Sequence, residues 1–379
     1  MSETSTEYLE IDIATRVLGE NEDIYVIRPG VNFSLYNDFQ REHAVFLDFP
    51  DLAIDLNKRP DGKVPLREAV VRSMAVREWH LSGAPADKEP SRDLTAYSGK
   101  AAGRRIGRYV GAIERLVYDL PVGTILLVPG PGYISDVYIG EITGPAEWLP
   151  AADAYGPERM AIRRVRWLAT KQKASFSKDL RDLLGRPDPL MSIDRSLRDE
   201  VLRFGYKQYI FEDTFSARLS TTEDDFSTLD DLRIQIFVNY VAGVLAADEL
   251  GVVSKAGLTL DEALSYLAER RDLVPELAQN INSAGWQRLY SETIAPMVIA
   301  VLMTGALAGT AFAQSTEVRI RNSAALKADP CAVQVEKRVE GSMKLIHFDE
   351  FKKICEGAKK ASEATGLRTS MHVERSERK

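Results

Sequence analysis

The chain has 379 residues and a formal net charge of −7, with 45% hydrophobic and 28% charged residues. This length predicts two or three domains with a substantial core, and the net negative charge argues against a protein that coats nucleic acid without specificity. Its two cysteines, Cys331 and Cys355, are too few for a disulfide framework or a cysteine-based zinc site.

The first half of the chain mixes short strand patterns with amphipathic helices. Runs of apolar and β-branched residues that end near glycine or proline predict strands at 24–30, 44–49, 124–129, 136–142 and 162–168. One helix is predicted from Pro65 to about Trp79, and a second carries an apolar stripe from Ile106 to Val117. A short helix that ends at Gly185 closes this half. Because strands and helices do not alternate strictly, the expected fold class is α+β.

The second half of the chain is predominantly helical. Helical patterns cover 230–250 and 349–364, and Thr259-Leu-Asp-Glu is a capping box that opens another helix. We therefore expect a flexible N-terminus, an α+β domain, a helical domain and a small C-terminal α/β segment, at 1–22, 23–195, 196–315 and 316–379.

The most informative pattern in the chain covers residues 24–194. Its segments are Tyr25-Val-Ile-Arg-Pro-Gly, Ser98-Gly-Lys-Ala-Ala-Gly, Tyr138-Ile-Gly-Glu-Ile-Thr-Gly, Arg163-Arg-Val-Arg-Trp-Leu and Phe176-Ser-Lys-Asp-Leu-Arg-Asp-Leu-Leu-Gly. In order and spacing they resemble the EVE-like branch of the PUA superfamily, in the form found at the N-terminus of Mrr-type modification-dependent restriction proteins. The resemblance implies a pseudo-barrel whose mouth accepts a base, often a modified one, swung out of its helix.

A base held in this way needs an aromatic partner, hydrogen-bonding groups for its edge and positive charge for the flanking phosphates. The candidate base contacts are Tyr133, Trp148, Tyr155, Asp136 and Glu147. The two carboxylates among them are acceptors for an exocyclic amine, whereas Tyr138 and Trp167 alternate with core positions and are expected to pack inside. The candidate phosphate contacts are Arg104, Arg105, Arg108, Arg163, Arg164 and Arg166. From Tyr97 to Leu190 the chain holds 14 Lys and Arg against 10 Asp and Glu.

A further feature is an uncharged run of twenty residues, Ile294 to Ala313. Its length meets the requirement for a membrane span, and Gly305 and Gly309 have the spacing that favours close helix packing. The positive residues that follow the run would place the base-binding domain outside the cell, so a buried helix is an equal alternative. The polar, acidic N-terminus predicts a cytoplasmic protein, with association with the inner membrane through 294–313 left open.

The sequence contains no P-loop, no G-x-S-x-G, no H-E-x-x-H and no His/Cys pair. The stretch from Asp329 to Lys337 has a faint likeness to the carboxylate–lysine strand of restriction nucleases, which holds Mg²⁺ and activates water. On a strand, however, the adjacent Glu336 and Lys337 would face opposite sides. The four histidines lack ligand spacing, so we expect neither a metal nor a cofactor.

These features predict a bacterial sensor in anti-phage defence. Its α+β domain would bind modified DNA, RNA or a modified nucleotide, and its helical part would act as an oligomerising, membrane-directed effector, with a homo-oligomer as the expected assembly. Two alternatives stay open: a divergent modification-dependent nuclease, and a nucleic-acid-binding scaffold without an effector of its own.

Overall fold

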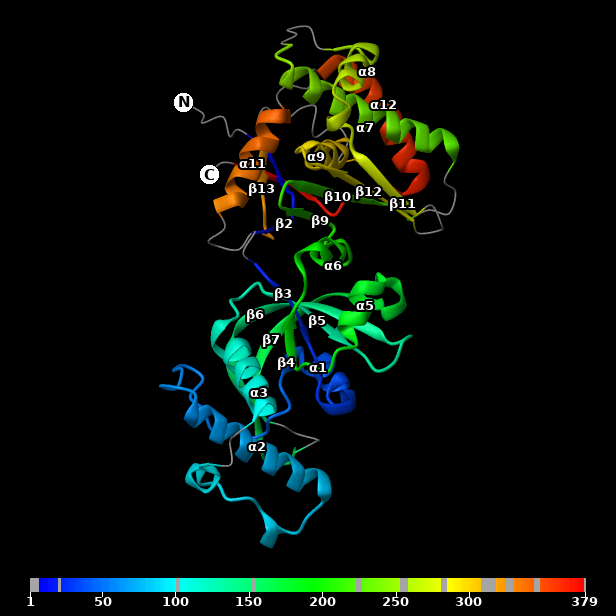
Figure 1. Cartoon of the computed structure of the whole chain (residues 1–379). Helices are drawn as coiled ribbons and strands as arrows, with labels where there is room; N and C mark the ends of the chain where they lie inside the picture. The colour runs from blue at the N-terminus through cyan, green and yellow to red at the C-terminus, as the bar shows by residue number, and fades with distance from the viewer. Residues whose placement is uncertain are drawn as a thin grey trace. The chain divides into compact units, whose positions relative to one another are not determined.

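Two compact units share the chain (Figure 1). The inserted unit is Asn21–Gly205, and the terminal unit combines Met1–Glu20 with Tyr206–Lys379. The computed structural model describes residues 7–19, 22–99, 103–150, 155–222, 227–252, 258–280, 285–307, 318–324, 330–343 and 348–377.

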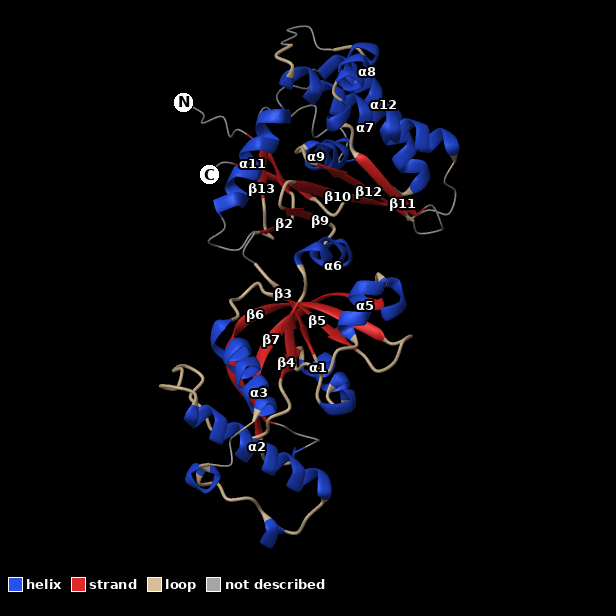
Figure 2. Ribbon diagram, in the orientation of Figure 1, coloured by secondary structure: helices blue, strands red, loops and turns tan. Residues whose placement is uncertain are grey.

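A six-stranded sheet forms the centre of the inserted unit (Figure 2). Its strands are β3 (Ile24–Ile27), β4 (Ala44–Phe46), β5 (Ile125–Pro129), β6 (Asp136–Pro150), β7 (Arg159–Gln172) and β8 (Leu190–Ser192). The order across the sheet is β4-β7-β6-β5-β3-β8, with β3 and β5 parallel and the other neighbours antiparallel. The unit is therefore a mixed α and β structure with an open sheet, in which β4 and β8 are the edge strands.

Among the described residues, five helices belong to the same unit as this sheet. They are α1 (Tyr36–Glu42), α2 (Val64–Ser82), α3 (Arg104–Glu114) with a π-helical turn η4 (Arg115–Asp119), α5 (Lys178–Leu184) and α6 (Arg198–Gly205). One of them, α3, carries together with η4 the apolar stripe that the sequence predicted from Ile106 to Val117. On α3, Val110 and Ile113 are buried in the core, while Arg104, Arg105 and Arg108 are exposed. This segregation is what the apolar stripe predicts.

Packing in the long β6–β7 hairpin accounts for the tyrosine and the first glycine of the sequence Tyr-Ile-Gly-Glu-Ile-Thr-Gly. A Cβ at Gly140 would lie 2.7 Å from the Trp167 ring, so glycine is needed for the ring to lie across the strand. Tyr138 is buried and stacks on Tyr36, with ring centroids 4.8 Å apart. Trp167 packs against the same core. The prediction that Tyr138 and Trp167 are packing residues is confirmed.

The terminal unit contains two sheets, of order β11-β12-β10-β9-β2 and β13-β1-β14. Their strands are β1 (Glu7–Asp12), β2 (Thr15–Leu18), β9 (Gln208–Phe211), β10 (Thr214–Ser220), β11 (Glu276–Asn280), β12 (Trp286–Ser291), β13 (Val318–Arg321) and β14 (His372–Glu377). The helices are α7 (Thr228–Glu249), α8 (Leu260–Glu269), α9 (Ala295–Leu307), α11 (Pro330–Met343) and α12 (Phe348–Thr365). Helix α8 begins with the predicted capping box at Thr259 and Glu262.

The N-terminal residues of this unit form strands, so the expectation of flexibility up to residue 22 is wrong for residues 7–18. Strand β1 pairs with β13 and β14, and β2 pairs with β9. The physical reason is an alternation of apolar residues that lets one face be buried, with Ile11 and Ile13 fully inaccessible.

The uncharged run contains a buried helix, α9. Its residues from Ala295 to Met303 are inaccessible or nearly so and belong to the core of the terminal unit. Among the described residues no helix is long and apolar enough to cross a membrane. Gly305 lies in α9, whereas Gly309 lies outside the described residues.

The stretch with a likeness to a nuclease strand is helical. Glu336 and Lys337 lie on α11, so this stretch does not form the strand to which the sequence has a faint likeness. Burial raises the pKa of Glu336, which disfavours the ionised carboxylate that a metal site uses. Asp329 lies outside the described residues.

Candidate functional site

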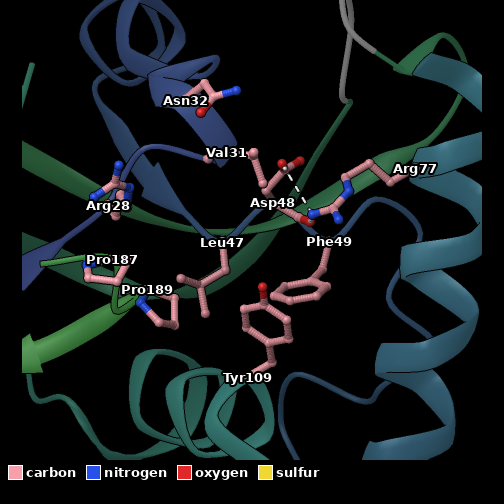
Figure 3. Close-up of a pocket in the computed structure, with 11 residues that line it drawn as sticks. Arg28, Val31, Asn32, Leu47, Asp48, Phe49, Arg77, Tyr109, Pro187 and Pro189 are labelled. Atoms are coloured by element: carbon pink, nitrogen blue, oxygen red, sulfur yellow. Dashed lines mark hydrogen bonds and ion pairs between the residues drawn. The ribbon is translucent and has the colours of Figure 1, made fainter. Parts of the chain in front are cut away.

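The inserted unit contains a cavity of about 230 Å³ where five parts of its chain meet (Figure 3). Its lining comes from the segment after β3, the end of β4, helices α2 and α3, and the segment before β8: Arg28, Gly30, Val31, Asn32, Leu47, Asp48, Phe49, Arg77, Tyr109, Pro187 and Pro189. We call this space the Tyr109 cavity. Pockets that combine apolar walls with a few polar groups are the usual form of small-molecule sites.

A sharp turn after β3 forms one side of the Tyr109 cavity. Gly30 has φ of 73°, and a Cβ there would lie 2.7 Å from the Ser34 hydroxyl oxygen. Asn32, which follows in the short helical turn η1 (Val31–Phe33), has φ of 54°, a conformation that is uncommon outside glycine. The Arg-Pro-Gly sequence therefore bends the chain so that Val31 and Asn32 face the cavity.

The opposite wall is aromatic. The rings of Phe49 and Tyr109 lie 5.2 Å apart between centroids at 69°, with Leu47, Pro187 and Pro189 beside them (Figure 3). Phe49 is buried, and Tyr109 is half-buried on α3. These flat apolar surfaces can contact a planar ligand.

A buried carboxylate gives the cavity its polarity. Asp48 accepts a hydrogen bond of 2.5 Å from the Tyr155 hydroxyl and lies 3.4 Å from a guanidinium nitrogen of Arg77. Burial, together with the Asp48 charge, raises the pKa of Tyr155 far above its usual range, so the phenol stays a donor. Because Arg77 balances its charge, Asp48 is a fixed acceptor rather than an unpaired ion.

Arginines line the rim of the Tyr109 cavity. The Arg105 Nε donates to the Tyr109 hydroxyl at 3.1 Å, and Arg108 is paired with Asp188 at 3.1 Å, next to the lining residue Pro189. Arg28, itself a lining residue, donates to the Arg186 carbonyl at 3.0 Å. Three arginines, of which Arg108 is paired with Asp188, therefore lie at or next to the lining of a cavity whose carboxylate is paired with Arg77.

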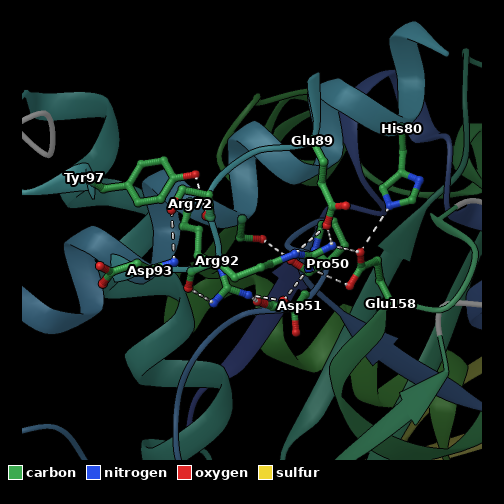
Figure 4. Close-up of polar contacts among 11 residues, drawn as sticks. Pro50, Asp51, Arg72, His80, Glu89, Arg92, Asp93, Tyr97 and Glu158 are labelled. Atoms are coloured by element: carbon green, nitrogen blue, oxygen red, sulfur yellow. Dashed lines mark hydrogen bonds and ion pairs between the residues drawn. The ribbon is translucent and has the colours of Figure 1, made fainter. Parts of the chain in front are cut away.

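A network of ion pairs supports the strand end that carries Asp48 (Figure 4). Arg92 lies 2.7 Å from both Asp51 and Glu158, and His80 lies 3.3 Å from Glu158. Arg72, on α2, also pairs with Asp51. Burial alone would raise the pKa of Glu158, but the hydrogen bonds from Arg92 and His80 outweigh burial and hold that pKa below its usual range. The network fixes the chain just after the lining residues Asp48 and Phe49.

The two preferred aromatic candidates lie at opposite ends of β6. Tyr133 precedes the strand and Trp148 is near its end, so a rise of about 3.3 Å per residue separates them by roughly 40 Å along the strand. Trp148 lies in a wider hollow of about 560 Å³ with Glu147, Asp55 and other residues, which we call the Trp148 hollow. Arg159 already covers the Trp148 ring at 4.2 Å. The structure therefore does not bring Tyr133 and Trp148 together.

Two of the predicted contacts are buried and serve the fold. Tyr155 is 2% exposed, so it offers no ring face to a base, and its role is to hold Asp48. Arg163 is also buried and donates to the carbonyls of Gly144, Leu116 and Leu120. The prediction that Arg163 contacts phosphate is wrong because its guanidinium is used to tie β7 to the end of η4.

The other predicted residues are accessible but are divided among different places. Glu147 is paired with Arg164 at 2.5 Å, and Arg166 is paired with Glu141 at 2.6 Å. The Asp136 side chain is exposed at the start of β6, and Arg104 is exposed at the start of α3. Among the predicted phosphate contacts, Arg105 and Arg108 lie beside the Tyr109 cavity.

Sequence reasoning missed the central residues of this cavity, Asp48, Phe49, Tyr109 and Arg28. One signal was present: a single aspartate interrupts the otherwise apolar strand Ala44-Val-Phe-Leu-Asp-Phe, where a buried charge needs a reason. Tyr109 gave no such signal, because an aromatic residue on the apolar stripe of a helix is expected to be core.

No family model, curated protein or solved structure matches the chain. The described residues also contain no group of three or more His, Cys, Asp or Glu side chains that could hold a metal ion.

Proposed function

We propose that the Tyr109 cavity binds a nucleobase, and that the inserted unit is the recognition part of a sensor. The observation that carries the proposal is the pairing of an aromatic wall, Phe49 and Tyr109, with a buried and fixed acceptor, Asp48, in one space of about 230 Å³. A flat ring bound there exchanges the stacking of a helix for contact with these side chains.

The edge chemistry favours a base with an exocyclic amine. Each oxygen of the Asp48 carboxylate accepts one protein contact, from Tyr155 or from Arg77, and retains a second lone pair. That lone pair can accept from the amine of a cytosine, adenine or guanine, whereas thymine and uracil have no such amine. The Asn32 amide at the turn can donate and accept. Asp48 thus takes the role that the sequence suggested for Asp136 and Glu147.

The arginines at the rim suit the phosphate that accompanies a base. Arg28, Arg105 and Arg108 come from the segment after β3 and from α3, and all lie at or next to the lining residues. Arginine binds phosphate oxygens through two parallel hydrogen bonds. This arrangement supports a nucleotide, free or within a strand, over an uncharged heterocycle.

The test is equilibrium binding of the full chain to a panel of nucleosides. The panel contains 2′-deoxycytidine, 2′-deoxyadenosine, their 5-methyl and N6-methyl forms, and thymidine. We expect amine-bearing nucleosides to bind and thymidine to bind most weakly. Tyr109→Ala should lose binding, Tyr109→Phe should keep it, and Tyr118→Ala, at a tyrosine outside the cavity, should be neutral. Absence of binding by every nucleoside, or equal binding by Tyr109→Ala, would overturn the proposal.

The response to binding is assigned to the terminal unit. Its core combines helices α7, α9 and α12 with strands β10 and β12. The chain crosses between this unit and the inserted unit twice, before Asn21 and after Gly205. If the protein is a sensor, adding a nucleoside that binds should change the amide hydrogen exchange of the terminal unit as well as that of the residues around the cavity. If protection changes in the inserted unit alone, the recognition role stands and the sensor role fails.

A further inference from the structure

The five-stranded sheet of the terminal unit has two faces of different composition. On one face, Phe215 and Leu289 belong to the core that helices α7, α9 and α12 complete (Figure 1). Side chains alternate between the two faces of a sheet, so Arg218 on β10 and Arg288 on β12 lie on the other face. We call it the polar face. It is inaccessible on β9, as at Tyr209, and half-buried at Arg218.

Three positive residues follow one another across the polar face. Arg218 lies directly opposite Arg288 in the β10–β12 ladder. On the other side of β10, the amide of Arg218 donates to the carbonyl of Lys207 at 3.0 Å and continues the β9–β10 register. Side chains directly opposite each other in a sheet lie about 5 Å apart at Cβ, where like charges repel. A row of this kind lowers the stability of the sheet unless an anion joins it.

The three cations are not equivalent. Arg288 is nearly inaccessible, and its guanidinium donates to the carbonyls of Tyr206 and Lys207 at 2.9 and 3.3 Å. The Arg218 guanidinium instead lies 5.3 Å from the centre of the Trp286 ring, and its buried Nε has no hydrogen-bond partner among the described residues. Within the same part of the chain, no ion pair involves Arg218 or Lys207. Arg218 is thus a partly desolvated cation whose charge is not balanced there.

Two aromatic side chains lie beside these cations. Trp286 is opposite Ser220, two residues along β10 from Arg218, and Tyr290 lies on the same face of β12 about 13 Å further on. Both rings are half-buried. On the other side of β10, the exposed Arg368 is joined to Ser220 by backbone hydrogen bonds of 2.7 and 2.6 Å. Aromatic residues on β12 are therefore flanked by cations on β10 and beyond it.

The chemistry of the polar face fits a single-stranded nucleic acid. Unpaired bases stack on exposed aromatic rings while basic side chains follow the phosphates, whereas the bases of a duplex are already stacked. The separation of about 13 Å between Trp286 and Tyr290 allows each ring to contact a different base. The acidic residue Glu276 lies opposite Tyr290 on the edge strand β11, one strand further from Arg218. Phosphates are thus expected on the β10 side of the rings.

We propose that the polar face of the terminal unit binds a single-stranded nucleic acid. Its phosphates contact Arg218, Lys207 and Arg368, and its bases stack on Trp286 and Tyr290. This site goes beyond the base-binding function of the Tyr109 cavity and does not depend on it. A bound phosphate relieves the repulsion between Lys207 and Arg218, so the strand also stabilises the terminal unit.

The experiment measures the binding of a fluorescein-labelled strand of about 15 thymidines to the full chain by anisotropy, over a range of salt concentrations. Thymine has no exocyclic amine, so this probe separates the polar face from the Tyr109 cavity. The variants are Arg218→Met and Trp286→Leu. The matched controls are Arg271→Met, at an exposed arginine of η7 (Arg271–Leu273), and Trp79→Leu, at a half-buried tryptophan of α2.

We expect Arg218→Met to bind the strand about tenfold more weakly and to reduce the slope of log affinity against log salt concentration by about 0.7. Trp286→Leu should weaken binding about tenfold without a change of slope, because it removes a stacking surface and no charge. Both controls and Tyr109→Ala should bind the strand as wild type does.

Folding of the variants is checked by urea unfolding. Arg218→Met should unfold at the same urea concentration as wild type or a higher one, because it removes one of three neighbouring like charges. Lys207→Ser, at an exposed side chain, provides a second variant that leaves the sheet intact, and it should bind the strand about threefold more weakly with a reduced salt slope.

Several results would show the proposal to be wrong. The wild-type chain could fail to bind the strand, or Arg271→Met could lose as much affinity as Arg218→Met, so that only total charge matters. Equal binding of a thymidine duplex with its complement, of thymidine triphosphate or of a polyglutamate peptide would exclude a single strand as the specific ligand. Each of these results leaves the nucleoside binding of the Tyr109 cavity to be judged by its own panel.

Discussion

The Tyr109 cavity and the Trp148 hollow lie in the same unit and both contain aromatic and charged residues, but they are built differently. The hollow is the larger, about 560 Å³ against about 230 Å³, and its carboxylate Glu147 is paired with Arg164 at the surface. In the cavity, Asp48 is buried and fixed by two neighbours. A half-buried tryptophan in a loop-like sequence is thus a weaker sign of a site than a buried carboxylate beside two rings.

What separates the two regions is preorganisation. The polar group of the cavity has its orientation set before any ligand arrives, and an ion-pair network around Asp51 and Glu158 supports the chain that carries it. A group that is already desolvated and oriented loses less entropy on binding. In the hollow, the Trp148 ring is already covered by Arg159, which a ligand would have to displace.

The largest expected difference between the two regions concerns their ion pairs. Arg77→Met leaves Asp48 buried without its counter-charge and should lower the free energy of unfolding by about 3–5 kcal/mol. Glu147→Gln, at a pair whose side chains are 40% and 46% exposed, should cost about 1 kcal/mol or less. Urea unfolding of both variants, followed by tryptophan fluorescence, measures the difference. Similar losses in the two variants would show that the buried pair and the surface pair contribute equally to stability.

The next effect concerns binding. Phe49→Leu keeps an apolar side chain but removes one aromatic face of the cavity, so it should weaken nucleoside binding by about 1–3 kcal/mol. Trp148→Leu should leave nucleoside binding unchanged, since the Trp148 hollow shares no lining residue with the cavity. Titration calorimetry with the tightest nucleoside of the panel measures both. A larger loss in Trp148→Leu would move the site to the hollow.

A smaller effect concerns the stability of the protein at acidic pH, because Glu158 has a lowered pKa in the folded protein. The stabilisation from this group is complete above its ordinary pKa of 4.5 and is lost as the pH falls below 4.5 through the lowered value. Glu158→Gln should therefore be less stable than wild type at neutral pH and should lose less stability on acidification. Thermal melting between pH 3 and 7 tests this. Parallel melting curves would show that the network around Arg92 does not contribute.

The smallest expected effect concerns the salt dependence of binding, through Arg108 at the rim of the Tyr109 cavity. Arg108→Ser removes a positive charge whose partner in the structure is Asp188. If Arg108 contacts phosphate, the slope of log affinity against log salt concentration for an oligonucleotide should fall by about 1, with little change in preference among bases. Arg164→Ser, next to the Trp148 hollow, is the matched control and should keep the wild-type slope. An equal fall in both variants would show that the arginines act only through total charge.

The sequence predicted local structure better than it predicted the site. The helices near 230–250 and 349–364 were predictable because their apolar residues repeat at helical spacing, and α8 because Thr259 and Glu262 form a capping box. The strands near 24, 124 and 136 follow from apolar runs that end in glycine or proline. Such signals are short-range, so they can be identified within one window of sequence.

The Tyr109 cavity could not be predicted in this way because its parts meet only in the folded unit. Asp48 and Tyr109 are 61 positions apart, and their meeting depends on how α3 packs on the end of β4. Burial also gives some predicted residues a different role. Tyr155 and Arg163 carry groups typical of nucleic-acid contacts, but both groups make hydrogen bonds inside the fold. Periodicity assigns a residue to a face and does not say what covers that face.

The pairing of β1 with strands at the far end of the chain has a consequence for synthesis on the ribosome. Asp12 pairs with His372, a residue made about 360 positions later. At about 5–20 residues per second, β1 waits roughly 20–70 s for that partner, whereas all the strands of the inserted unit have been made by residue 192. The inserted unit can thus complete its sheet while β1 still lacks its partners β13 and β14. During that interval the nascent chain exposes an unpaired strand edge, which makes it a substrate for chaperones.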